Sequence, residues 1–163
     1  MPKSADRATA TSSLLHRQGT GRSHESTSAH GSPAAGTGWA LYSLSQRYGV
    51  DDAFALAFFW HESNFGLNGE AARTHSLGNL RCIEGVACID QDRGGYASFL
   101  DWPSGYAAWY ALIAGSVYVG AGRTTVESII PVYAPAADNN DESAYIGSVT
   151  SVVMKLRAGQ LSL

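Results

Sequence analysis

The sequence predicts a mainly α-helical domain with about five helices and one small β-hairpin. Apolar residues recur with helical spacing along much of the chain, whereas Gly and short polar residues gather between residues 76 and 99. The start of the domain is marked by composition, because all seventeen aromatic residues lie after Gly38. We therefore expect the domain at residues 37–163. Residues 1–36, rich in Ser, Thr and Gly, are expected to form a disordered tail or linker.

Charge and hydropathy exclude two classes of partner. The net charge of −3 divides into +2 over residues 1–36, with four basic and two acidic residues, and −5 over the remainder. An acidic domain without a basic stripe argues against nucleic acid as a partner. The longest apolar run, residues 53–60, is far shorter than the roughly 20 residues that span a bilayer, so no membrane insertion is expected. The first residues show no signal peptide.

The first two helices are expected in the first half of the domain. Residues 38–48 form one helix, with Trp39 on its buried side. A second helix follows, and either Asp51 or Asp52 can cap it. This helix is expected to end at Gly66, because Gly is favoured just past a helix end.

A hairpin is expected between residues 76 and 99, where short alternating fragments are separated by Gly. Cys82 and Cys88 fit the two arms of a tight hairpin joined by a disulfide, and the alternative is a pair of free, buried thiols. The two cysteines neither form a C-x-x-C motif nor supply four zinc ligands. A disulfide would imply an oxidising compartment.

Three further helices complete the prediction. Ser104 is expected to cap the first of them, and Thr124 opens the second, which Pro131 ends or kinks. The last helix begins near Asn139 and has the clearest apolar face, formed by Tyr145, Ile146, Val149, Val152, Val153 and Leu156.

The apolar second helix ends in polar residues, and its carboxylate is the first functional signal. Glu62 lies one helical turn after Phe58, so its carboxyl group projects from an apolar face. Desolvation raises the pKa of such a group, and a carboxylic acid still protonated near neutral pH is what general-acid cleavage of a glycosidic bond requires. The alternative is a Glu at a helix end that simply reaches water.

His61 and Glu62 also begin the zinc-protease signature H-E-x-x-H, but position 65 is Phe. We therefore expect no metal, and no organic cofactor is implied. His61 is expected to be a packed or hydrogen-bonded core residue near a groove.

Further features follow Glu62 in a specific order. The string E-S-x-x-G contains Ser63, a Gly-Asn loop contains Gly78 and Asn79, and Tyr133 sits at a helix–loop junction. Each is weak alone, but their order and spacing together are more specific.

With these features, the sequence resembles the glucosaminidase family of bacterial autolysins, part of the lysozyme-like superfamily that includes goose-type lysozymes and lytic transglycosylases. The resemblance covers residues 39–157 and rests on "YGVDDAFALAFFWHESNFG", "SLGNLRC", "GGYASFLDWPSGYAAWYAL" and "VYAPAADNNDESAYIGSV". It implies a lysozyme-like α+β fold with a hairpin flanking a sugar-binding groove. It also implies that Glu62 is the general acid and that Ser63, Gly78, Asn79 and Tyr133 contact the substrate.

The hairpin and its exit offer Glu84, Asp90, Asp92 and Asp101 as a second catalytic carboxylate. In relatives that have one it lies on the hairpin, which favours Asp90 or Asp92 over Asp101. The carboxyl separation distinguishes inversion from retention of the sugar configuration. Without a second acid, a hydroxyl or acetamido group of the substrate could complete the reaction.

We therefore expect a monomeric endo-β-N-acetylglucosaminidase that acts on peptidoglycan, or on a chitooligosaccharide-like glycan, outside the cell or in its wall. The closest alternatives are a muramidase and a lytic transglycosylase. A non-catalytic module that binds cell-wall glycan is a further alternative. The last is an interaction domain whose acidic surface meets a basic partner.

Overall fold

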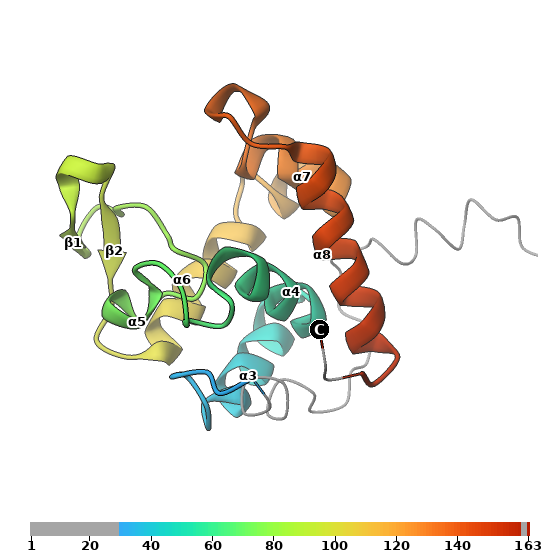
Figure 1. Cartoon of the computed structure of the whole chain (residues 1–163), viewed down its shortest axis with the longest axis horizontal. Helices are drawn as coiled ribbons and strands as arrows, with labels where there is room; N and C mark the ends of the chain where they lie inside the picture. Colours follow the sequence, from blue (N-terminus) through green and yellow to red (C-terminus); the bar gives the residue numbers. More distant parts are fainter. Residues whose placement is uncertain (1–29, 161–162) are drawn as a thin grey trace, which may run out of the picture.

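The computed structural model describes residues 30–160 and residue 163 (Figure 1). Within them, six α-helices and a two-stranded antiparallel sheet confirm the predicted mainly α fold with a small hairpin. The four-residue helix α5 was not predicted. The elements are α3 (Gly38–Tyr48), α4 (Asp52–Ser63), α5 (Ala71–Thr74), β1 (Ala87–Ile89), η1 (Gln91–Arg93), β2 (Tyr96–Ser98), α6 (Trp102–Ala114), η2 (Val119–Ala121), α7 (Val126–Tyr133), η3 (Ala136–Asp138) and α8 (Glu142–Arg157).

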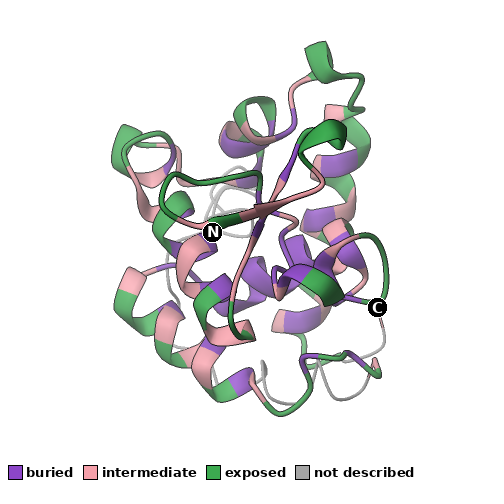
Figure 2. Ribbon diagram, turned by 90° about the vertical axis from the view of Figure 1, so that its left-hand side faces the viewer, coloured by how far each residue is buried: buried purple, intermediate pink, exposed green. Residues whose placement is uncertain are grey.

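Helix α4 forms the centre of the domain. Every residue from Asp51 to Phe59 is buried, and a helix buried on all sides has no polar face. Helix α8 packs along α4, while the hairpin projects on the opposite side of the molecule (Figure 1). Figure 2 shows the buried residues gathered on the inner helices and the exposed ones on the outer turns. Within the described residues, no helix has both the length and the apolar character that crossing a membrane requires.

Two contacts of Asp51 fix the start of helix α4. The Asp51 carboxylate caps the helix by accepting a hydrogen bond from the Ala53 N–H at 2.9 Å, so Asp51 rather than Asp52 is the cap. The same carboxylate pairs with Arg157 Nη2 at 2.7 Å. This ion pair fixes the end of α8 to the start of α4.

Helix α4 ends at Ser63, three residues before the predicted end at Gly66. The chain then turns through Asn64, Phe65 and Gly66, whose φ angles of 47°, 54° and 87° all lie in the left-handed region. A side chain at Gly66 would crowd its neighbours, because a Cβ there would lie 3.0 Å from Leu77 Cδ2. Phe65 is fully buried in a backbone conformation that is costly for an aromatic residue.

The packed part of the domain begins earlier than the predicted boundary at residue 37. Ser32 donates a hydrogen bond to the Phe65 carbonyl at 2.7 Å, and Ala34 is fully buried. This segment therefore supports the strained turn after α4. Residues 1–29, the rest of the predicted tail, lie outside the described residues.

The predicted caps of the last three long helices are one to three residues away from the observed ones. In each helix the observed cap is the side chain whose oxygen accepts the N–H three positions further along. The observed caps are Asp101 for α6, Thr125 for α7 and Asp141 for α8, where the sequence favoured Ser104, Thr124 and Asn139.

One other expectation was wrong, and a second, that Pro131 ends or kinks its helix, was wrong about the helix end. Trp39 is 66% exposed at the start of α3, where it lies against Tyr42 with ring centroids 5.4 Å apart. Pro131 lies inside α7, which continues to Tyr133. A proline removes one backbone hydrogen bond, and a short helix can continue past that loss when its remaining residues pack.

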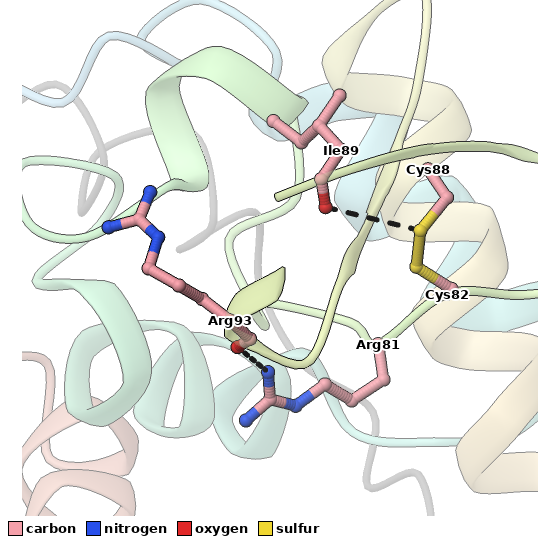
Figure 3. The surroundings of a disulfide bond; sticks show 5 residues. All are labelled: Arg81, Cys82, Cys88, Ile89 and Arg93. Atoms are coloured by element: carbon pink, nitrogen blue, oxygen red, sulfur yellow. Dashed lines mark hydrogen bonds between the residues drawn. A yellow bond between two sulfur atoms is a disulfide. The ribbon is translucent and has the colours of Figure 1, made fainter. Parts of the chain in front are cut away.

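The hairpin pairs β1 with β2, with Cys88 opposite Ala97. The Cys82–Cys88 disulfide is present, but Cys82 lies in the loop before β1 (Figure 3). The bond therefore ties that loop to a strand and does not join the two strands. Gly95 packs against both sulfur atoms, where a Cβ would lie only 2.4 Å from Cys82 Sγ.

Candidate active site

A cleft of about 700 Å³ opens at the C-terminal end of α4. One wall comes from the loop before β1 and from β2, and another comes from α7, the connection after it and α8. In Figure 1 the hairpin and α7 lie on different sides of the end of α4. Four predicted site residues line this cleft and three do not; the first group is Glu62, Gly78, Asn79 and Tyr133, and the second is Ser63, Asp90 and Asp92.

Glu62 occupies the last turn of α4 and is half-buried in the cleft. Its Oε1 accepts a hydrogen bond from the Tyr145 hydroxyl. Burial raises the pKa of Glu62, while the Tyr145 hydrogen bond and the charge of Arg81 act in the opposite direction and are weaker. The carboxyl group therefore keeps its proton to higher pH than a solvated Glu does.

Tyr145 is a site residue that the sequence analysis placed only on the buried face of the last helix. Helix α8 places the Tyr145 hydroxyl where it donates a hydrogen bond to the Glu62 carboxyl group. Burial, and then the negative charge of Glu62, raise the pKa of Tyr145, so the phenol stays protonated and remains a donor. The sequence feature that could have identified Tyr145 is that it is an aromatic residue at the start of an otherwise aliphatic helix face.

His61 lies at the edge of the cleft and not in the core, where it was expected. Its ring centroid is 3.8 Å from that of Tyr145, and its Nδ1 is 3.1 Å from Ser148 Oγ. Partial burial of the ring lowers the pKa of His61, so the imidazole is neutral near neutral pH. His61 thus packs the phenol of Tyr145 against the carboxyl group.

The Gly78–Asn79 loop holds the end of α4. Asn79 Nδ2 donates to the Glu62 carbonyl at 2.9 Å, which satisfies one of the carbonyls left open at a helix end. Gly78 leaves room for Trp109, since a Cβ at position 78 would lie 2.6 Å from the indole Cδ1. Tyr133 donates to the Gly78 carbonyl at 3.3 Å. These residues position the backbone around the carboxyl group while also lining the cleft.

Ser63, predicted to contact substrate, is buried and supports the fold instead. Its Oγ lies 2.8 Å from the Leu77 carbonyl oxygen and accepts a hydrogen bond from the Gly66 N–H at 2.9 Å. The hydroxyl therefore links the end of α4 to the segment before the Gly78–Asn79 loop. The E-S-x-x-G pattern marks a turn and not a substrate contact.

The hairpin acids do not line the cleft. Asp90 belongs to a group that we call the hairpin-base cluster, consisting of Glu70, Arg73, Asp90 and Arg93. Its carboxylate lies 3.1 Å from Arg73 Nη1 and 3.0 Å from Arg93 Nη2. Asp92 is exposed in η1. Neither acid therefore lies in the cleft, where a second catalytic carboxylate would act.

Asp138 is the second carboxylate that lines the cleft, besides Glu62. Among the described residues, these two acids line the cleft. Asp138 ends η3, in the connection that is held by a 2.7 Å hydrogen bond from the Ala136 N–H to the Glu142 carboxylate. The sequence did not point to Asp138, because the family resemblance favours a second acid on the hairpin.

Within the part of the chain that the structure describes, no three His, Cys, Asp or Glu residues are grouped so that they could hold a metal ion. A scan against protein-family models and a search of curated proteins found no match to this chain.

Proposed function

We propose that this chain is a glycoside hydrolase that cleaves the glycan strands of bacterial peptidoglycan outside the cell or in its wall. The observation that carries the proposal is the half-buried carboxyl group of Glu62, with a raised pKa, in a cleft of about 700 Å³. The sequence resemblance supports an endo-β-N-acetylglucosaminidase as the specific activity. The contacts of Asn79 and Tyr145 support Glu62 as the centre of the chemistry.

Glu62 acts in this proposal as the general acid. Its protonated carboxyl group gives a proton to the glycosidic oxygen as the bond to the sugar carbon breaks. The carboxylate that remains accepts the Tyr145 hydrogen bond, which stabilises the charged form. Tyr145 therefore favours the state that proton transfer creates.

Asp138 is the candidate for the second half of the reaction. It lines the cleft from a different element than Glu62, so it could activate the water that attacks the sugar carbon. The position of Asp90 in the hairpin-base cluster supports this choice over the hairpin acids.

The test is digestion of purified peptidoglycan with wild type and with Glu62→Gln, with mass spectrometry of the new ends. Reducing N-acetylglucosamine ends that only wild type produces are the expected result. Reducing N-acetylmuramic ends would replace the glucosaminidase by a muramidase, and anhydro ends would replace it by a lytic transglycosylase. Identical products from both proteins would remove Glu62 from the chemistry.

One observation favours a second candidate function, a non-catalytic module that binds cell-wall glycan. Neither Asp90 nor Asp92 supplies the second acid that the resemblance implies. Binding of glycan by wild type without any cleavage, across walls of different composition, would support this module against the enzyme.

A further inference from the structure

Arg81 is the one Arg or Lys among the described residues that line the cleft. It lies between the Gly78–Asn79 loop and Cys82, whose disulfide ties this stretch to β1 (Figure 3). Its backbone is therefore fixed on both sides, by the loop that holds Glu62 and by the covalent link to the hairpin.

The guanidinium group of Arg81 is held against the hairpin but is not paired with an acid. Its Cζ lies 4.8 Å from the centroid of the Tyr96 ring, and its Nη1 donates one long hydrogen bond, 3.5 Å, to the Arg93 carbonyl (Figure 3). A Cβ at Gly94 would lie 2.9 Å from the same nitrogen. Within the described residues, no carboxylate forms an ion pair with Arg81. Most of its five N–H donors thus have no partner among the described residues, and the residue lines the cleft.

The charge of Arg81 works against the proposed role of its neighbour. It lowers the pKa of Glu62, whereas a general acid must hold its proton. An anionic group on the bound substrate would compensate that charge and remove the effect. A stacked, oriented and unpaired guanidinium is also the arrangement that binds a carboxylate with two parallel hydrogen bonds.

We infer that Arg81 binds a carboxylate of the glycan and makes the cleft selective for acidic over neutral N-acetylhexosamine chains. This inference rests on the proposed glycosidase function and specifies its substrate. In peptidoglycan the carboxylate has two sources. One is the lactyl group of the muramic sugar where no peptide is attached, and the other is the stem peptide.

Calorimetric binding tests this in the Glu62→Gln background, which prevents turnover. The ligands are a soluble chitin oligosaccharide, peptide-stripped peptidoglycan strands of matched length, and strands that keep their stem peptides. Each is measured with and without Arg81→Gln. The matched control is Arg47→Gln, because Arg47 also stacks on a tyrosine, 5.6 Å from the Tyr48 ring, but lies on α3 outside the cleft.

Arg81→Gln should weaken binding of a carboxylate-bearing strand by about ten- to a hundredfold, and Arg47→Gln should leave it unchanged. A larger loss with stripped strands identifies the lactyl carboxylate, and a larger loss with peptide-bearing strands identifies the peptide. Equal losses for the acidic strands and the neutral oligosaccharide would overturn the inference while leaving the glycosidase intact. Failure to bind any of the three ligands would overturn both.

Discussion

Glu62 and Asp90 are carboxylates whose neighbours differ in kind. Glu62 accepts a hydrogen bond from one neutral phenol, and among the described residues it forms no ion pair, although the charge of Arg81 acts on it from a distance. Asp90 lies within 3.1 Å of two guanidinium groups, from Arg73 and Arg93. The first carboxyl group is held where burial raises its pKa, whereas the second lies between two cations in a surface cluster.

The chemistry of each acid is decided by the elements that bring neighbours to it. Helix α4 carries Glu62 out of a fully apolar stretch, and α8 brings a hydroxyl to it. Desolvation therefore outweighs the Tyr145 hydrogen bond and the charge of Arg81, which both lower the pKa of Glu62. The hairpin instead places Asp90 beside arginines whose side chains are 60% and 62% exposed, where ion pairs contribute little.

The largest expected effect separates these two acids by activity. Glu62→Gln should lower the rate of peptidoglycan solubilisation by about 10²–10⁴-fold, because the amide cannot donate a proton as an acid does. Asp90→Asn, the matched control, should change the rate by no more than about twofold, since its charge serves only a surface cluster. The measurement is the initial rate of each purified variant, after circular dichroism has shown that both are folded. Similar losses in the two variants would erase the proposed distinction.

The next effect extends the comparison to a third carboxylate. Asp138→Asn should lower the rate by about a hundredfold if its carboxylate activates water. Asp92→Asn serves as the control, because Asp92 is an exposed acid outside the cleft. Added azide, a small anionic nucleophile, should restore part of the lost rate to Asp138→Asn. Full activity of this variant would instead assign the second step to a group on the substrate.

The position of Glu62 at the end of a buried helix could be predicted from the sequence because local rules decide it. An unbroken apolar run predicts a buried helix. A carboxyl group in the last turn of that helix lies beside the apolar residues one turn earlier, however the other elements pack. The same local reasoning placed the last helix face, and Val149, Val152, Val153 and Leu156 are buried.

Tyr145 and Asp138 could not be found in the same way. Tyr145 reaches Glu62 across 83 positions of sequence, through the packing of α8 on α4. Asp138 lines the cleft because a 3₁₀ turn after α7 directs the chain there. Ser63 shows the opposite error, in which a local motif was taken as a contact although its hydroxyl faces the interior.

A smaller effect concerns pH and tests whether the neutral phenol controls Glu62. Tyr145→Phe removes a hydrogen bond that lowers the pKa of Glu62, so that pKa rises further. The proposed reaction needs the protonated form, and the alkaline limb of the pH–kcat/KM profile should therefore move to higher pH. The maximal rate should fall at the same time, because the carboxylate formed by proton transfer loses its donor. An unmoved limb, or one shifted to lower pH, would contradict this role; Tyr42→Phe is the control, on α3 away from the cleft.

The smallest effect, on the free energy of unfolding, is expected in the hairpin-base cluster, although it contains four charged side chains. Arg73→Gln removes two ion pairs of the hairpin-base cluster, yet it should leave the free energy of unfolding nearly unchanged because the side chain is largely exposed. Arg157→Gln removes the ion pair with Asp51 at the start of α4, in which the two side chains are 18% and 6% exposed. It also removes the contact of Arg157 with the Phe54 ring. That change should cost about 2–4 kcal/mol, since it leaves a buried carboxylate without its cation. Urea unfolding of both variants at neutral pH compares them directly. A loss for Arg73→Gln as large as that for Arg157→Gln would mean that the hairpin-base cluster holds the fold together and is more than a surface feature.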